Sequence, residues 1–423
     1  MQKLTLTAII LFLVFTGTGT FGQKANTSFP EIYKLIEQKD YFNAKEMYEK
    51  RKESLPAGYR HFTKAFIENA FNRPAESQAC ITWLADHHTE IPDSLLFRMY
   101  LVNEDNAIKI CDYKAAEKAV TTVLDSYGKY LTGYERDDYS NNRKIWKALR
   151  DVPPQQVTIS DNTNLKMEKD IAGFNNLKVS VAGDTINFIF DTGANFSTTT
   201  FSVAERMKMK IINADIEVGS ITGQKVVSQL AVCDKFSFGN IEVRNAVFLV
   251  LPDSALSFPQ ISYQIFGVLG FPVIEALREI QITRDGHFIV PKSEIAFAGN
   301  SNMALDGLTP LILLNGRHFS FDTGADKTIL YQSFYLAHKD YFDHNYTQAK
   351  TGMGGAGGKI ETQAYIIDQA FTVSGKEIIL KDVTLLMDKI KEDEDVYGNI
   401  GQDLIGQFSK MTLNFDRMFI EFE

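Results

Sequence analysis

Two aspartates, Asp191 and Asp322, lie 131 residues apart in nearly the same short sequence. Residues 187–194 read Asn-Phe-Ile-Phe-Asp-Thr-Gly-Ala, and residues 318–325 read His-Phe-Ser-Phe-Asp-Thr-Gly-Ala. In each copy the alternating phenylalanines predict a strand with one buried face, and Thr-Gly predicts a tight turn after the aspartate. Two carboxylates about 4 Å apart repel strongly enough to hold one proton between them. One carboxylate can then act as a base while the other donates a hydrogen bond.

The segments downstream of the two aspartates repeat with the same offset. Val268-Leu269-Gly270 corresponds to Asn399-Ile400-Gly401, and residues 282–289 correspond to residues 413–420. A single Asp-Thr-Gly would be weak evidence, because Asp and Gly are common in turns. Three segments in one register indicate a duplicated β unit. The second copy departs from the pattern at Asn399, where the first copy has a valine, and this departure predicts different packing there.

The elements that carry these motifs are predicted to be strands. From the break at residues 151–154 (Asp-Val-Pro-Pro) onward, short alternating apolar segments are separated by Gly, Asn and Asp turns. This pattern is typical of an all-β region.

Residues 28–150 have helical apolar spacing instead. The segment that begins at Asp40 recurs in weaker form at Asp112, and this offset of 72 is twice 36. A period near 36 resembles tetratricopeptide-like helical hairpins, with Ala44 and Ala116 as the small residues between paired helices. A generic helical bundle is the alternative.

Residues 1–22 are predicted to be a secretory signal peptide. Lys3 precedes an apolar run from Leu4 to Phe15, and small and polar residues follow, so cleavage is expected after Gly22. An uncleaved N-terminal anchor is the alternative, although the run is short for a membrane span. We therefore expect an exported protein, periplasmic or extracellular, with no stable membrane span after cleavage.

The composition argues against several other classes of protein. The chain has 423 residues and a formal net charge of −9, and no Lys/Arg-rich block is present, which argues against nucleic-acid binding. Three cysteines (Cys80, Cys111 and Cys233) are too few for a disulfide scaffold, and whether Cys80 and Cys111 pair stays open. The seven histidines are scattered, so neither a metal nor another cofactor is expected.

The duplicated Asp-Thr-Gly-Ala motif resembles that of the retropepsin-like aspartic peptidases, and bacterial exported proteins of this type are the nearest match. The resemblance covers about residues 157–423. It implies a bilobal, acid-protease-like β-barrel domain, with lobe 1 over residues 157–298 and lobe 2 over residues 299–423. Together with a helical domain over residues 28–150, the expected fold class is multidomain, an N-terminal helical hairpin array followed by an all-β domain.

The same resemblance implies a role for each residue of the two motifs. Asp191 and Asp322 would activate the water that attacks the peptide bond. Thr192 and Thr323 would exchange the hydrogen bonds that lock the two turns together. Further support at the site is expected from Gly193, Ala194, Gly270, Gly324, Ala325 and Gly401.

The two alanines bear on the pH dependence. Pepsin-like enzymes commonly have Ser or Thr at the positions of Ala194 and Ala325, and that hydroxyl stabilises the ionised pair. Without it, the pair should keep its shared proton to higher pH, which predicts activity at mildly acidic to near-neutral pH.

A glycine-containing segment follows each aspartate at a similar distance, and the resemblance implies a flap over the substrate there. Clustered glycines favour a mobile hairpin tip, with an ordinary flexible turn as the alternative. The flap residues are expected to be Gly219, Ser220, Ile221, Thr222 and Gly223 in the first half, and Gly352, Met353, Gly354 and Gly355 in the second.

These expectations lead to an exported aspartic endopeptidase that acts on a peptide or protein substrate. The helical domain would dock a protein partner or regulate the site. One pair of aspartates per chain makes a monomer sufficient for catalysis. Two alternatives stay open: a non-catalytic peptide-binding protein on a peptidase-like fold, and a precursor in which residues 23–156 mask the cleft.

Overall fold

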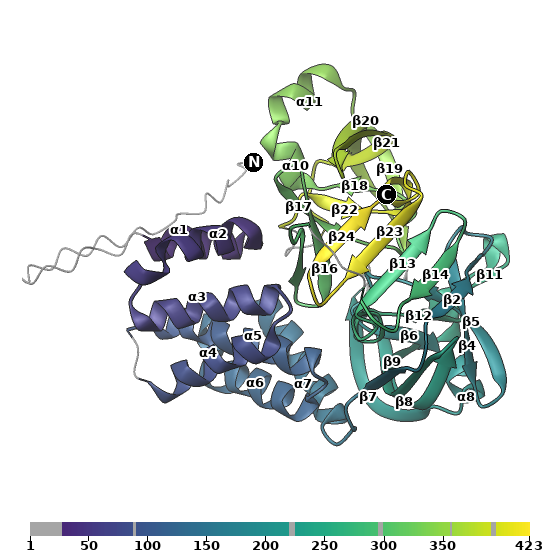
Figure 1. Ribbon diagram of the computed structural model, residues 1–423, viewed down its shortest axis with the longest axis horizontal. Coiled ribbons are helices and arrows are strands. Elements are labelled where there is room, and N and C mark those ends of the chain that lie inside the picture. Colours follow the sequence, from purple (N-terminus) through teal and green to yellow (C-terminus); the bar gives the residue numbers. More distant parts are fainter. Residues whose placement is uncertain (1–27, 88–89, 220–224, 295–298, 356–357, 391–394) are drawn as a thin grey trace, which may run out of the picture.

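The chain is described here from a computed structural model. The structure describes residues 28–87, 90–219, 225–294, 299–355, 358–390 and 395–423. The predicted signal peptide therefore lies outside the described residues. Within those residues, no helix is both long enough and apolar enough to cross a bilayer. Helices occupy the chain up to Leu149, and strands with short connecting helices follow from Gln156 to Phe422 (Figure 1).

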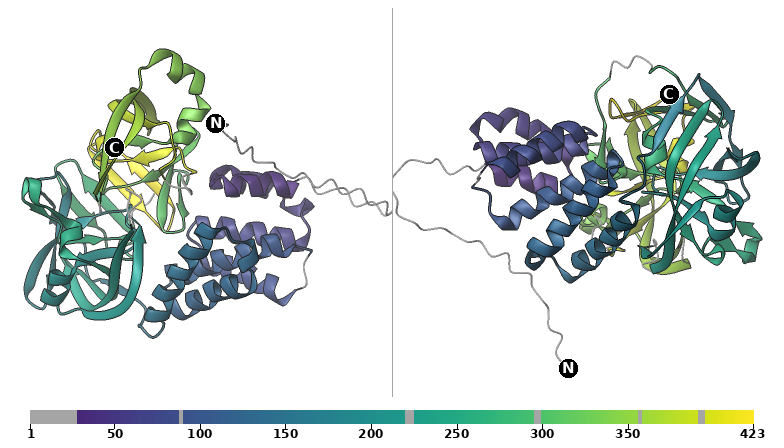
Figure 2. Two further views of the ribbon diagram at one scale, coloured as in Figure 1. Left: turned by 180° about the vertical axis from the view of Figure 1, so that it is seen from behind. Right: turned by 90° about the horizontal axis from the view of Figure 1, so that it is seen from below.

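The N-terminal region is a stack of helices in which each helix packs on the next one along the chain (Figures 1 and 2). The small side chains of Ala44 on α2 and Ala116 on α6 are fully buried. The helices are α1 (Ser28–Glu37), α2 (Tyr41–Arg51), α3 (Ala57–Ala70), α4 (Pro74–Asp86), α5 (Asp93–Lys109), α6 (Tyr113–Ser126) and α7 (Gly133–Leu149).

One left-handed turn recurs after α1, α3 and α5. Lys39, Asn72 and Cys111 have positive φ angles of 59°, 55° and 57°, respectively. After two of these turns an aspartate caps the next helix, since Asp40 accepts from the N–H of Asn43 and Asp112 from that of Ala115. The recurrence explains the similarity of the two Asp-containing segments. The tetratricopeptide-like assignment itself stays a prediction.

The first sheet carries the first Asp-Thr-Gly turn. Its strand order is β1-β9-β6-β12-β5-β4-β8-β7, and β3 pairs with β4 at its side. The strands are β1 (Gln156–Ile159), β3 (Glu168–Lys169), β4 (Asn175–Val181), β5 (Asp184–Phe190), β6 (Ser197–Thr200), β7 (Lys210–Gly219), β8 (Lys225–Phe238), β9 (Ile241–Leu251) and β12 (Gly267–Leu269).

The second sheet carries the second turn and repeats the order of the first. In the first sheet β9 also pairs with β8, so a path β4-β5-β12-β6-β9-β8-β7 runs through it. The second sheet from β16 onward, β16-β17-β22-β18-β21-β20-β19, corresponds to this path strand for strand. In both, the strand before the turn pairs in parallel with the strand before the downstream glycine. The strands are β15 (Met303–Asp306), β16 (Thr309–Leu314), β17 (Arg317–Phe321), β18 (Ile329–Leu330), β19 (Ala349–Gly355), β20 (Gly358–Val373), β21 (Lys376–Leu386) and β22 (Gly398–Ile400).

A further sheet joins the two halves. Its order is β2-β14-β13-β23-β24, and β13 of the first half pairs in antiparallel fashion with β23 of the second. Its strands are β2 (Thr163–Lys166), β13 (Glu279–Thr283), β14 (His287–Val290), β23 (Lys410–Asn414) and β24 (Phe419–Phe422). The connections contain the strands β10 (Ser257–Phe258) and β11 (Tyr263–Gln264) and the helices α8 (Phe201–Arg206), α9 (Phe271–Glu275), α10 (Gln332–Ala337), α11 (Lys339–Asn345) and α12 (Gln402–Ile405).

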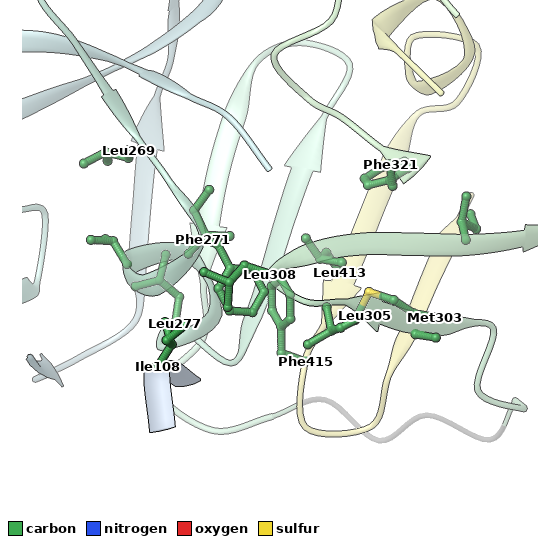
Figure 3. Close-up of a cluster of buried hydrophobic side chains, with 14 of the residues drawn as sticks. Ile108, Leu269, Phe271, Leu277, Met303, Leu305, Leu308, Phe321, Leu413 and Phe415 are labelled. Carbon is green, nitrogen blue, oxygen red and sulfur yellow. The ribbon is translucent and has the colours of Figure 1, made fainter. Parts of the chain in front are cut away.

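The apolar core is continuous from the helices into the sheets. Ile108 at the end of α5 lies beside Leu277 and Phe271 of the first half, and Leu308 and Phe415 continue the cluster into the second (Figure 3). The three cysteines are buried free thiols within this core. Because the core crosses the boundary between helices and strands, the helical region supports the β region directly.

Candidate active site

The two aspartates emerge at equivalent places in the two sheets. The strand residues before them, Phe190 and Phe321, are buried at 1% and 0% exposure, which anchors each turn. The N–H of Asp191 donates to the carbonyl of Leu269 at 3.2 Å, and the N–H of Asp322 donates to that of Ile400 at 3.0 Å. Each aspartate is thereby fixed to the strand that precedes the downstream glycine.

The two turns are joined by hydrogen bonds between their threonines. The N–H of Thr192 donates to Oγ1 of Thr323, and the N–H of Thr323 donates to Oγ1 of Thr192, both at 3.0 Å. The hydroxyl of Thr192 donates to the carbonyl of Phe321 at 2.8 Å, and the hydroxyl of Thr323 donates to the carbonyl of Phe190 at 3.0 Å. Both threonines are buried. The predicted exchange of hydrogen bonds between the turns is therefore present in the geometry.

The glycine of each turn lies against the aspartate of the other. A Cβ atom added at Gly193 would lie 2.6 Å from Cγ of Asp322, and one added at Gly324 would lie even closer to Cγ of Asp191. Real Cβ atoms do not approach other atoms so closely, so only glycine fits at either position. The two motifs are thus brought together as one unit.

The carboxylates of this unit form a coupled pair. The N–H of Gly193 donates to Oδ1 of Asp191 and the N–H of Gly324 to Oδ1 of Asp322, each at 2.8 Å. Burial, the charge of Asp322 and a hydrogen bond to Asp322 raise the pKa of Asp191 well above its ordinary value. The pair therefore retains a proton at pH values where isolated aspartates have lost theirs.

Asn399 is a polar contact of this pair that the sequence analysis missed. Its Nδ2 donates to Oδ2 of Asp322 at 2.9 Å. The sequence pattern presented Asn399 only as a departure in packing. A usable signal was present, because the facing residue on β17 is also polar, Ser320, whereas the first half has Val268 facing Ile189.

The downstream glycines support the turns from behind. A Cβ at Gly270 would lie 2.7 Å from the carbonyl oxygen of Ala194, and one at Gly401 would lie 2.8 Å from that of Ala325. These carbonyls accept hydrogen bonds at 2.8 Å from the residues that follow the two glycines. The alanine side chains carry no hydroxyl, so the pair receives no hydrogen bond from them.

The predicted flap segments fall at the ends of two hairpins. In the first half the hairpin of β7 and β8 has Gly219 facing Lys225, and the other expected flap residues, Ser220 to Gly223, lie outside the described residues. In the second half, Gly352, Met353, Gly354 and Gly355 form the last residues of β19, paired with β20. Residues 356–357 at that tip also lie outside the described part.

The helical region contacts both the β7–β8 hairpin and the first turn through α7. The side-chain amide of Asn141 bonds the backbone of Glu217 on β7 twice, donating to its carbonyl and accepting from its N–H, each at 2.8 Å. Trp146 packs against Phe196, which follows the first Asp-Thr-Gly-Ala, with ring centroids 5.9 Å apart. Among the described residues, no group of His, Cys, Asp or Glu side chains is arranged to hold a metal ion.

The comparisons with known proteins bear on the first half. A family model described as aspartyl protease matches residues 177–273, from β4 through α9, which include the first Asp-Thr-Gly turn and Gly270. The chain contains an aspartyl-protease-like domain. The match ends before the second turn, which is related to this domain by the shared strand order.

The chain is also similar to solved structures of other proteins. These include conglutin gamma, described as a unique basic 7S globulin from lupine seeds (11% identity), and basic 7S globulin from soybean (13% identity). Each comparison covers 62% of this chain and 94% of the other, with a TM-score of 0.36, and carries no conclusion about activity. No curated protein sequence matches the chain.

Proposed function

We propose that the protein is an aspartic endopeptidase that hydrolyses peptide bonds with a water activated between Asp191 and Asp322. The observation that carries the proposal is the joining of two Asp-Thr-Gly turns by reciprocal threonine hydrogen bonds. The raised pKa of Asp191 supports it further, because a shared proton supplies an acid and a base in one site.

In this mechanism the ionised carboxylate removes a proton from the water as its oxygen bonds to the carbonyl carbon. The protonated carboxyl donates to the carbonyl oxygen, which stabilises the negative charge that develops there. The C–N bond then breaks, and the amine leaves with a proton that the water has passed to the carboxylate. No covalent intermediate with the protein forms, and the pair returns to its singly protonated state.

The proposal includes the wider organisation of the protein. We propose that residues 157–298 and 299–423 form two lobes, and that residues 219–223 and 352–355 act as flaps over the substrate. Residues 28–150 would dock a protein partner or regulate the active site. The matching strand order supports the two lobes. The contacts of α7 with β7 and Phe196 support a role for the helices at the site. Export to the periplasm or the cell exterior is proposed from the N-terminal sequence.

The test is cleavage of a diverse peptide mixture from pH 3 to pH 8 by the mature protein and by the variants Asp191→Asn and Asp322→Asn. Both variants keep the shape of the side chain but remove a titrating group, so each should lose about 10²–10⁴-fold in rate or more. Binding of peptides without cleavage by the wild type would favour the non-catalytic alternative. Cleavage that survives in both variants would place the chemistry elsewhere.

A further inference from the structure

The polar pair of Ser320 and Asn399 makes the two aspartates chemically unequal. Asn399 on β22 faces Ser320 on β17 in the parallel register, and Val268 faces Ile189 at the equivalent positions of the first half. The amide of Asn399 donates to Asp322 at 2.9 Å. Valine has no donor, so Asp191 gains no such bond from Val268. Backbone N–H groups of its own turn also donate to each carboxylate, Gly193 and Ala194 to Asp191 and Gly324 to Asp322, and Asp322 has the side-chain amide in addition.

The orientation of the amide follows from Ser320. Oγ of Ser320 lies 2.7 Å from Oδ1 of Asn399 and 3.1 Å from the carbonyl oxygen of Gly398. With the hydroxyl hydrogen directed at Oδ1, the amide oxygen is satisfied and the NH₂ group faces Asp322. An amide turned by 180° would instead present its oxygen to Asp322 and accept a proton from it. The two orientations predict opposite effects on the carboxyl, so they can be separated by experiment.

We propose that Asn399 is a positioning residue that keeps the negative charge of the pair on Asp322 and the shared proton on Asp191. A donor to a carboxylate stabilises its ionised form. This inference rests on the proposed peptidase function and assigns the two roles within it. Asp322 takes the proton from water, and Asp191 donates to the carbonyl oxygen of the peptide.

The other charged groups around Asp322 leave this argument in place. The ionisable group hydrogen-bonded to it is Asp191, from the opposite turn. The strands that pair with β17, β16 and β22, contain no ionisable residue. Further along its own turn, Asp326 and Lys327 are exposed to solvent, and Asp403 of α12 accepts from the N–H and the hydroxyl of Thr328.

The experiment measures the pKa of one aspartate at a time, in the full-length mature chain, by NMR titration of ¹³C-labelled aspartate carboxyls. In the Asp191→Asn background, adding Asn399→Val should raise the pKa of Asp322 by about one unit, because the ionised form loses a donor. In the matched Asp322→Asn background, the same substitution should leave the pKa of Asp191 unchanged.

Each outcome decides the proposal. A lowered pKa of Asp322 in the absence of Asn399 would mean that the amide accepts from the protonated acid, and the roles would be reversed. An unchanged pKa, or an equal shift of Asp191, would overturn the inference as well. These results do not depend on peptide cleavage, so they stand apart from a failure of the proposed function.

A kinetic measurement adds the link to catalysis. In Asn399→Val with both aspartates present, the acid limb of kcat/KM should move up by about one pH unit while the alkaline limb stays in place. The acid limb reports formation of the singly charged pair, which Asn399 stabilises. A loss of packing alone would lower activity at every pH without moving the acid limb, and that result would contradict the proposal.

Discussion

At the scale of single residues, close contact between the two turns decides what can be substituted. Gly193 and Gly324 each lie where a methyl group would collide with the aspartate of the opposite turn. The threonines next to them are buried and use both their N–H and their hydroxyl across the junction. The geometry of the carboxylate pair therefore depends on residues that do not titrate.

We predict that Gly324→Ala abolishes peptide hydrolysis and separates the carboxylates, because its Cβ would overlap Asp191. The loss in kcat/KM should be at least about 10²-fold, since a displacement of 1 Å at a reacting group has an effect of that size. The matched control is Gly133→Ala at the start of α7, where an added Cβ meets no atom within 4 Å. Steady-state kinetics of both variants checks the prediction, and a Gly324→Ala protein as active as the control would contradict it.

Much of the site was predictable from the sequence, because a strand, an aspartate and a tight turn lie together in the chain and are repeated. Asp191, Asp322 and the threonines needed only this local pattern. Asn399 was not recognised because its role depends on contact with a residue 77 positions away. A polar residue in an apolar element shows that something differs, but only the pairing of β22 with β17 shows what it contacts.

At the scale of elements, α5 and α7 are held together by a buried acid. Glu104 on α5 is only 4% exposed and accepts from the indole N–H of Trp146 on α7 at 2.6 Å. Burial raises the pKa of Glu104 from 4.5 to about 8. The folded protein therefore holds this proton more tightly than the unfolded chain does. Stability from this residue is complete below about pH 4.5 and is lost as the pH rises toward about 8.

We predict that Glu104→Gln stabilises the protein at pH 8 but not at pH 4.5. Glutamine is neutral at both pH values and can still accept from Trp146, so the variant avoids ionisation of a buried acid. The difference in the free energy of unfolding at pH 8 should be on the order of 2 kcal/mol. Urea denaturation at the two pH values measures it, with Glu76→Gln on the exposed face of α4 as the control. An equal effect of Glu104→Gln at both pH values would show that ionisation is not involved.

The division of the chain into helices and strands could be predicted from the spacing of apolar residues and from the turn residues. The recurring turn after α1, α3 and α5 accounts for the related segments at Asp40 and Asp112. The pairing of the strands could not be read in the same way. It joins strands far apart in the chain, as β12 with β5 and β22 with β17, and short strands carry too little pattern to select a partner.

At the scale of the whole molecule, the helical and β regions share an apolar core and polar contacts. Ile108 of α5 packs in the cluster with Phe271 and Leu277 (Figure 3). Lys39 forms an ion pair with Asp306 at 2.7 Å, beyond the reach of any local sequence pattern. These contacts were not predictable, because they depend on single side chains that meet across the boundary. They imply that the two regions unfold together.

We predict one cooperative unfolding transition for the mature protein, and a loss of about 2–4 kcal/mol in Ile108→Ala. The two tryptophans, Trp83 and Trp146, lie in the helical region, so their fluorescence reports its unfolding. Hydrogen exchange in β13 reports the β region. The two transitions should coincide in the wild type and shift together in the variant. Ile110→Ala, at a side chain that is 59% exposed, is the control. Separate transitions would contradict the prediction.

The ladder between β13 and β23 has a consequence for the origin of the chain. Gln281 faces Thr412, its own counterpart 131 positions later, and the register runs symmetrically to either side. Thr192 and Thr323, also 131 positions apart, exchange hydrogen bonds in the same reciprocal way. Equivalent surfaces that meet about a two-fold axis are what two identical subunits form in an isologous dimer. The two halves therefore meet within one polypeptide as two identical subunits would meet in a homodimer, which is the arrangement that a gene duplication would leave.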